Sequence, residues 1–242
     1  MTDLILALDQ GTTSSRSILF TEKAEIRAVA SEPLECRYPD SGWVEQDAEA
    51  IWETQRSTIV KVLDQAGIGL SVVSAIGITN QRESTIAWNR ETGEALCPAI
   101  NWQCRRTAGF CDELKEEGFD ELIRNRTGLV TDPYFSGTKM HWILQNVPEA
   151  ANLARQGKLC FGTVDSWLIW KLSGGTTHAI EISNASRTLV FDIQKCEWDS
   201  EILSRFGIPP ESLPEVVPSS GVIAEVDESL FGGSAPIAGA AG

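Results

Sequence analysis

Histidine is scarce in this sequence, because only His141 and His178 among its 242 residues carry an imidazole. The two lie far apart in the chain, and none of the six cysteines forms a Cys-x-x-Cys pair. We therefore expect no zinc site, and no Ser-His-Asp arrangement for nucleophilic catalysis can be assembled. We interpret the histidines as structural and the cysteines as reduced thiols, several of them packed in the core.

Basic residues are also few, with 20 Lys and Arg against 34 Asp and Glu, which gives a net charge of -14. So acidic a surface repels phosphate backbones, and we expect no nucleic-acid partner. No apolar run approaches the roughly 20 residues that span a bilayer, so we expect no membrane span. The opening residues, Met1 to Leu4, lack the basic region of a secretory signal, which favours a cytoplasmic protein.

The remaining composition is that of an ordinary globular protein, with 42% hydrophobic and 22% charged residues. The length allows one large domain or two small ones. Apolar Leu4–Leu8 predicts a strand buried on both faces, and a second strand at 16–20 would complete a hairpin. Residues 47–66 predict a helix capped by Asp47 and ended by Gly67. Helices at 105–117, 135–145 and 164–172 and returning strands at 188–193, 221–226 and 236–238 make this a mixed α/β domain.

The two common nucleotide-binding patterns, GxxxxGK[ST] and GxGxxG, are absent. A different polar turn, LDQGTTSSR, follows the first strand. Its glycine permits a tight backbone path, its hydroxyls suit phosphate oxygens, its aspartate suits a metal ion and its arginine suits phosphate charge. The candidate residues are Asp9, Gly11, Thr12, Thr13, Ser14 and Arg16. The alternative is an ordinary hairpin turn in which Asp9 accepts from local amides.

Three further segments carry candidates for binding a small polyol. Arg82 and Glu83 follow an apolar strand, where they can donate to and accept from vicinal hydroxyls; the alternative is a solvated turn. Trp102 can provide an apolar wall for a carbohydrate-like ligand, or it can be a core tryptophan. Tyr134 offers a hydroxyl on a rigid ring, or it can simply pack against a helix. We interpret Arg105 and Arg106, which follow Trp102 in the sequence, as charges on a helix surface.

Taken together and in order, these motifs resemble the N-terminal half of the glycerol kinases, within the FGGY carbohydrate kinase family. The resemblance extends from Leu4 to Gly242 and rests on the stretches LDQGTTSSR, GWVEQD, AIGITNQRES, WQCRRTA, TGLVTDPYFSGTK, GTVDSWLIWKL and SNASRT. WQCRRTA and TDPYFSGTK together favour glycerol over pentulose sugars as the substrate.

The resemblance implies a fold, a reaction and roles for individual residues. The fold is the ribonuclease-H-like ATPase fold of actin, Hsp70 and hexokinase, and the reaction is transfer of phosphate from ATP to glycerol with Mg²⁺. Nucleotide-phosphate contacts fall on Thr12, Thr13, Ser14 and Arg16, and the acid near magnesium is Asp9. Glycerol contacts fall on Arg82, Glu83 and Tyr134, with Trp102 as the aromatic wall. The intact enzymes of this family commonly form dimers or tetramers.

The sequence departs from the family pattern in two places. Ile180 to Ser183 replaces the usual Thr-Asp-x-Thr before Asn184, so the contacts there need not be conserved. The family's general base follows a strand that here ends at Gly242, so it would be residue 243. We therefore expect residues 1–242 to be the N-terminal, polyol- and phosphate-binding domain, with negligible kinase activity without the nucleotide domain. The alternatives are a kinase for another small polyol or sugar, and a non-catalytic actin-like binding module.

Overall fold

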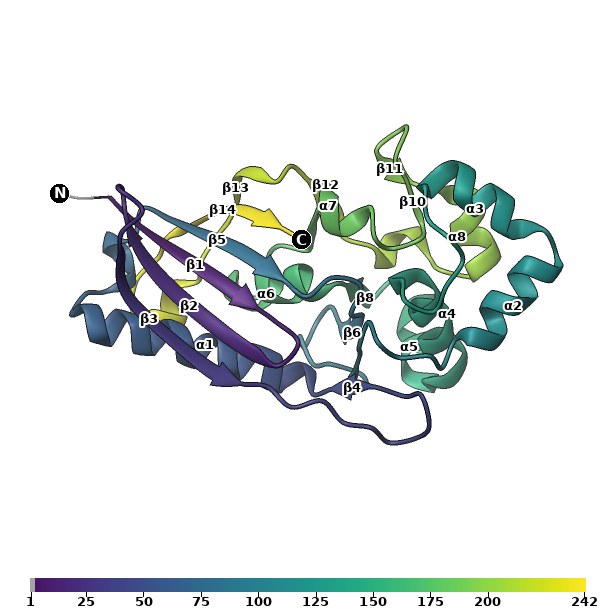
Figure 1. The fold of residues 1–242 in the computed structure, drawn as a ribbon, viewed down its shortest axis with the longest axis horizontal. Helices are drawn as coiled ribbons and strands as arrows, with labels where there is room; N and C mark the ends of the chain where they lie inside the picture. The colour runs from purple at the N-terminus through teal and green to yellow at the C-terminus, as the bar shows by residue number, and fades with distance from the viewer. Residues whose placement is uncertain (1–2) are drawn as a thin grey trace.

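A six-stranded mixed sheet dominates one part of the computed structural model, which describes residues 3–242 (Figure 1). The predicted hairpin is confirmed, because β1 (Leu4–Gln10) pairs antiparallel with β2 (Ser14–Thr21). On its other edge β1 pairs parallel with β5 (Ala75–Asn80). The full order is β13-β14-β5-β1-β2-β3, with β3 at Ile26–Pro33, β13 at Ser220–Glu225 and β14 at Pro236–Ala241. The parallel β1-β5-β14 segment brings the carboxyl ends of three strands to one edge.

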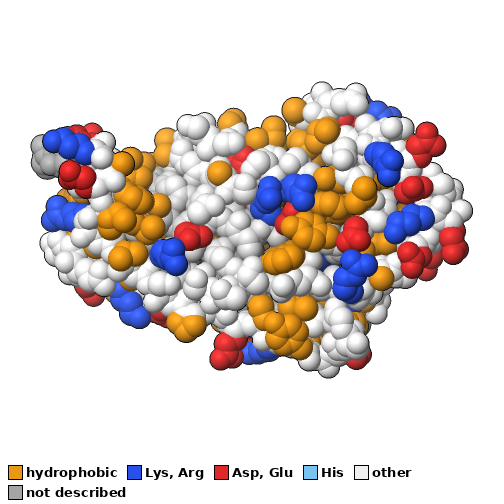
Figure 2. Space-filling view, in the orientation of Figure 1, with side chains coloured by type: hydrophobic (Ala, Val, Ile, Leu, Met, Phe, Trp, Pro, Cys, Tyr) orange, Lys and Arg blue, Asp and Glu red, His pale blue; other side chains and the backbone are white. Residues whose placement is uncertain are grey.

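The prediction that β1 is buried on both faces is wrong. Its side chains alternate, so that Leu4, Leu6 and Leu8 are buried while Ile5 is 43% exposed. Helices cover only one face of this sheet, and the face seen in Figure 1 is open. Figure 2 shows hydrophobic side chains gathered over the strands on that open face. A continuous apolar run cannot distinguish a strand covered on both sides from one covered on a single side.

Helix α1 (Ala48–Ala66) supplies most of the cover on the closed face. Its predicted ends are confirmed: the Asp47 carboxylate accepts from two amides of the first turn, and Gly67 closes the helix with a φ of 65°. Ile59 and Val62 are fully buried against the sheet, as the helical spacing predicted. Helix α6 (Val164–Leu172), also predicted, packs beside α1, and its Trp167 indole donates to the carbonyl of Ala48.

A second apolar core lies among the helices that Figure 1 shows beyond the end of the sheet. The predicted helices 105–117 and 135–145 are confirmed as α2 (Ala108–Glu116) and α4 (Ser136–Asn146). The remaining helices are α3 (Phe119–Thr127), α5 (Pro148–Arg155), α7 (Ile182–Ala185), α8 (Ser200–Phe206) and α9 (Glu228–Phe231), with 3-10 turns at Leu70–Val72 and Pro210–Ser212. Short strand pairs join β4 (Glu45–Gln46) to β7 (Ala99–Ile100), β6 (Ile86–Asn89) to β8 (Leu159–Gly162), β9 (Ala179–Glu181) to β12 (Glu215–Val217), and β10 (Phe191–Asp192) to β11 (Glu197–Trp198).

Arg106 is not the surface charge that its neighbourhood predicted. Only 2% of its side chain is exposed, and its guanidinium donates to the Glu45 carboxylate at 2.7 Å. The group lies over the rings of Trp43 and Trp142, at 3.9 and 4.6 Å from their centroids, in the corner that these two edge-to-face rings form. Arg105 is exposed, as predicted. The aliphatic stem and the guanidinium of an arginine can both be buried when aromatic rings and a carboxylate replace the water around them.

Two further predictions can be compared with the described residues, and a third falls partly outside them. The six cysteines carry free thiols, and Cys104, Cys111 and Cys160 are buried in the core as expected. Within residues 3–242, no helix combines the length and the apolar character needed to cross a bilayer. The prediction about a secretory signal falls partly on Met1 and Thr2, which lie outside the described residues.

Candidate functional site

The polar turn after β1 is tight and leaves its hydroxyls accessible. The Gly11 amide donates to the Ser14 carbonyl at 2.9 Å, and a Cβ at Gly11 would lie 3.2 Å from that oxygen. Thr12 and Ser14 are half-buried and Thr13 is exposed. Asp9 and Arg16 face each other across the hairpin, about half exposed, with 3.8 Å between guanidinium and carboxylate. At that distance and exposure the two charges are only loosely paired, and both can reach a ligand.

The turn rests on a buried cluster of amide side chains contributed by four separate segments. Gln46 donates to the Thr12 carbonyl at 2.8 Å, and Gln81 donates to the side-chain oxygens of Gln10 and Gln46 at 3.1 and 3.0 Å. Asn101 completes the cluster by donating to Gln46 at 2.9 Å. All four amides are at most 8% exposed, and a satisfied buried network of this kind holds the backbone in one conformation.

Trp102 connects the turn that is predicted to bind phosphate with the residues that are predicted to bind the polyol. Its indole donates to the Thr12 hydroxyl at 2.9 Å, so the ring is fixed by a polar contact as well as by packing. The ring centroid of Tyr134 lies 5.6 Å away in an edge-to-face arrangement. The backbone amide of Trp102 donates to Ser84, which follows Glu83 directly. The tryptophan is therefore part of the site region and not of either apolar core.

Glu83 has a strained backbone, with a φ of 61° in a region that side-chain-bearing residues rarely adopt. Two hydrogen bonds from α4 reach its carbonyl, one from Lys139 at 3.0 Å and one from Ser136 at 3.1 Å. The Lys139 ammonium also donates to the carbonyl of Tyr134 at 2.5 Å. Lys139 and Ser136 lie on the first turns of α4 and are fully buried. Burial lowers the pKa of Lys139 to about 7, although the nearby Glu83 carboxylate acts in the opposite direction.

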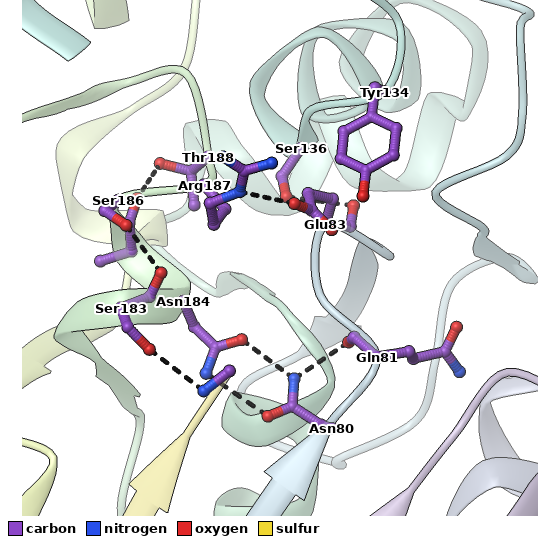
Figure 3. Close-up of polar contacts among 12 residues, drawn as sticks. Asn80, Gln81, Glu83, Tyr134, Ser136, Ser183, Asn184, Ser186, Arg187 and Thr188 are labelled. Carbon is purple, nitrogen blue, oxygen red and sulfur yellow. Dashed lines mark hydrogen bonds and ion pairs between the residues drawn. The ribbon is translucent and has the colours of Figure 1, made fainter. Parts of the chain in front are cut away.

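The Glu83 carboxylate is itself buried, with 2% of the side chain exposed. Figure 3 shows Arg187 reaching it from the segment after α7, and Nε donates to Oε1 at 2.7 Å. The guanidinium also lies 5.0 Å from the Phe135 ring centroid and 5.8 Å from that of Tyr134. Arg187 was not among the predicted site residues, although it stands in the motif SNASRT that carried part of the resemblance.

The segment that departs from the family pattern before Asn184 has a local structural role in this chain. Glu181 is buried and caps α7 by accepting from the amides of Ser183 and Asn184. Burial acts to raise the pKa of Glu181, but bonds from Ser183 and Ser219 outweigh it, so the pKa is lowered and the residue stays charged. Asn184 accepts a hydrogen bond from Asn80 at the end of β5, which places the α7 segment beside the strand end that leads to Glu83 (Figure 3).

The structure brings the predicted residues into one region at the carboxyl edge of β1 and β5. Thr12, Trp102, Tyr134 and Glu83 are linked by direct contacts or through Lys139. Arg82 is half-buried beside Gly242, where a Cβ would lie 2.7 Å from its Cδ. Asp9 and Arg16 lie on the hairpin, with no direct contact to the polyol residues among the described hydrogen bonds. The residues that the sequence did not reveal are Gln46, Gln81, Asn101, Lys139, Ser136 and Arg187.

Comparison with known proteins agrees with this architecture. Residues 4–242 match the profile of the FGGY family of carbohydrate kinases, N-terminal domain. The chain is 52% identical over 239 residues to a glycerol kinase from Carboxydothermus hydrogenoformans, covering 98% of this chain and 48% of the relative. A glycerol kinase from Koribacter versatilis is 54% identical over 238 residues, with the same coverage. The chain spans about half the length of the curated relatives it matches.

Solved structures give the same result for the fold. The crystal structure of Plasmodium falciparum glycerol kinase with ADP superposes with a TM-score of 0.91 at 30% identity, over 99% of this chain and 48% of that one. Xylulose kinase from Rhodospirillum rubrum superposes with a TM-score of 0.87 at 24% identity, over 98% of this chain and 48% of that one, and shows the fold alone. The actin-like, ribonuclease-H-like fold implied by the resemblance is thus confirmed. The chain belongs to the FGGY family of carbohydrate kinases, and residues 4–242 correspond to the N-terminal domain of that family.

Proposed function

We propose that this chain is the polyol- and phosphate-binding domain of an ATP-dependent glycerol kinase. The observation that carries the proposal is the Trp102 indole bonded to Thr12, because it joins a phosphate-suited turn to a carboxylate- and aromatic-lined polyol site. Phosphoryl transfer needs an acceptor hydroxyl and a nucleotide phosphate held side by side. The names of the two relatives reported above, glycerol kinases at 52% and 54% identity, support glycerol as the acceptor.

In this proposal Glu83 accepts a hydrogen bond from one glycerol hydroxyl and Arg82 donates to another. Trp102 and Tyr134 enclose the carbon chain, and the Tyr134 hydroxyl adds a polar contact. Such a set distinguishes a short polyol from water by using several hydroxyls at once, with a charged partner strengthening each bond. The strained conformation of Glu83 places its carboxylate in a buried position, where that bond is strongest.

The turn at 11–14 would receive the phosphate groups of ATP. Thr12, Thr13 and Ser14 supply hydroxyl donors on a rigid backbone, and Arg16 neutralises phosphate charge. The exposed Asp9 carboxylate fits magnesium, which binds proteins through one or two carboxylates together with substrate phosphates. When bound, Mg²⁺ supplies neutralisation of the charge that develops on the transferred group.

The substrate is tested by comparing rates for the full-length gene product on glycerol, xylulose and erythritol with ATP. We expect the highest kcat/KM on glycerol, and a higher value on xylulose would reject the assignment. The glycerol kinase relatives are about twice as long as these 242 residues, so we expect the 242-residue chain alone to turn over negligibly and to bind glycerol only in the millimolar range. Calorimetry that gave a sub-millimolar dissociation constant would contradict this expectation. Sedimentation would decide whether the gene product is the dimer or tetramer that we propose.

A further inference from the structure

We propose that Arg187 is a positioning residue of the polyol site, holding the Glu83 carboxylate so that one of its oxygens faces the ligand. The inference rests on the proposed glycerol site, and it extends that site to a segment 104 residues away in sequence from Glu83. It is carried by the geometry of the contact and by the way in which both partners are fixed.

The Arg187–Glu83 contact is a single-point contact. Nε donates to Oε1 at 2.7 Å, which is the distance of a charge-assisted hydrogen bond. No hydrogen bond among residues 3–242 reaches the other oxygen, Oε2. A bidentate pair would have occupied both oxygens, whereas this arrangement leaves one acceptor for a hydroxyl. Arg187 thus orients the carboxylate without competing for the atom that the ligand needs.

Arg187 is anchored independently of Glu83. Its guanidinium lies over the Phe135 ring, 5.0 Å from the centroid, in a favourable cation–π arrangement. Its backbone amide donates to the carbonyl of Asn184, which in turn bonds to Asn80 at the end of β5. Glu181 fixes the start of the same short helix. The arginine is therefore held in place by the fold as well as by Glu83.

Charge makes the contact consequential. A buried carboxylate that loses its cation is left uncompensated, which is strongly unfavourable. The charged and titratable groups facing the Glu83 residue are Arg187 on its carboxylate, Lys139 on its backbone carbonyl, Arg82 next in sequence and Tyr134. Within residues 3–242, only Arg187 bonds to the carboxylate itself. Without it, no other side chain in that range fixes the carboxylate in the orientation that the polyol site needs.

The chain contains a second arginine ion pair that serves as a control. Arg205 donates to Glu117 at 2.7 Å, its side chain is 29% exposed against 27% for Arg187, and its guanidinium lies 5.3 Å from the Phe110 ring. This contact reaches both carboxylate oxygens, and Glu117 is 52% exposed, whereas Glu83 is buried. Arg205 lies on α8 and has no hydrogen bond to the predicted site residues, so Arg205→Gln reports what the loss of an arginine ion pair outside the site does to the chain.

The experiment measures two quantities on the 242-residue chain and its Arg187→Gln, Arg187→Lys and Arg205→Gln variants. The first is the ¹³C chemical shift of the Glu83 carboxyl carbon at a fixed pH, assigned by its loss in Glu83→Gln. The second is the glycerol dissociation constant from ligand-observed NMR. We expect Arg187→Gln to move the Glu83 carboxyl resonance and to weaken glycerol binding about tenfold. Arg187→Lys should recover part of both effects, and Arg205→Gln should show neither.

An unchanged Glu83 carboxyl resonance in Arg187→Gln, or equal weakening of glycerol binding in Arg205→Gln, would overturn the inference. If Arg187→Gln fails to fold, the lysine variant decides, because it keeps the charge while losing the fixed guanidinium geometry. Wild-type chain that binds no glycerol would count against the proposed function. The carboxyl resonance is measured without ligand, so it would still decide whether Arg187 contacts and orients Glu83.

Discussion

We expect the free energy of unfolding of the wild-type chain to rise between pH 7.0 and 8.5, and we expect the replacement of Lys139 by methionine to abolish that rise. Lys139 is fully buried, and burial lowers its pKa from the ordinary 10.5 to about 7. Its two acceptors are backbone carbonyls, and a neutral amine still has two N–H groups to donate to them. The folded chain can therefore release this proton near neutral pH without losing either hydrogen bond.

The sign and size follow from proton linkage. Between pH 7 and 10.5 the unfolded lysine holds a proton that the folded one has released, so the free energy of unfolding rises with pH. Over the interval from 7.0 to 8.5 the gain is about 1–2 kcal/mol, which for a chain of this size corresponds to roughly 3–6 °C in Tm. The upper limit matters because burial raises the pKa of Cys97 to about 11 and that of Cys111 and Cys160 to about 12. Those thiols lower the free energy of unfolding once the pH exceeds the pKa of a cysteine in the unfolded chain.

The assay is thermal unfolding at the two pH values for wild type, Lys139→Met and the exposed-site control Lys115→Met. The wild type and the control should gain several degrees at pH 8.5, and Lys139→Met should gain much less. An identical pH dependence in wild type and Lys139→Met would refute the reasoning. It would mean that the buried amine keeps its proton throughout this range.

Three other predictions concern single positions. Gly137→Ala should lower the free energy of unfolding by about 1–3 kcal/mol, because its Cβ would lie 2.7 Å from the Thr188 carbonyl oxygen. In the control Gly109→Ala, the added Cβ of this helical residue meets no atom within 4 Å and should stabilise the chain slightly. Equal Tm values for the two variants would contradict this prediction. Burial lowers the pKa of His178 to about 4, so stability should fall as the pH drops from about 6.5 towards 4, and His178→Gln should lose that slope in acid titrations followed by circular dichroism. Glu181→Ala should weaken the cap of α7 by about 1 kcal/mol and speed hydrogen exchange in its first amides; unaltered exchange would reject the capping role.

Local chemistry was readable along the chain wherever neighbours in sequence decide the structure. The β1–β2 hairpin and the α1 helix with its Asp47 and Gly67 ends follow from apolar spacing, a capping carboxylate and a glycine free to adopt a positive φ. The polar turn around Thr12 and the Arg82–Glu83 pair were predicted as site residues because hydroxyls and charges directly follow apolar strands there, and the binding sites of α/β proteins collect at strand ends. Their roles in binding remain predictions.

Tertiary structure decided everything that joins distant segments. Periodicity could not show that one face of β1 is open, or that Arg106 is buried against Trp43 and Trp142, because burial depends on what packs from elsewhere. The sequence pointed to Glu83, but only the fold shows a strained residue held by Lys139 and paired with Arg187, across 56 and 104 positions respectively. Sequence by itself determined which side chains end the strands; the three-dimensional contacts determined their charge, orientation and partners, since electrostatic interactions act through space and not along the chain.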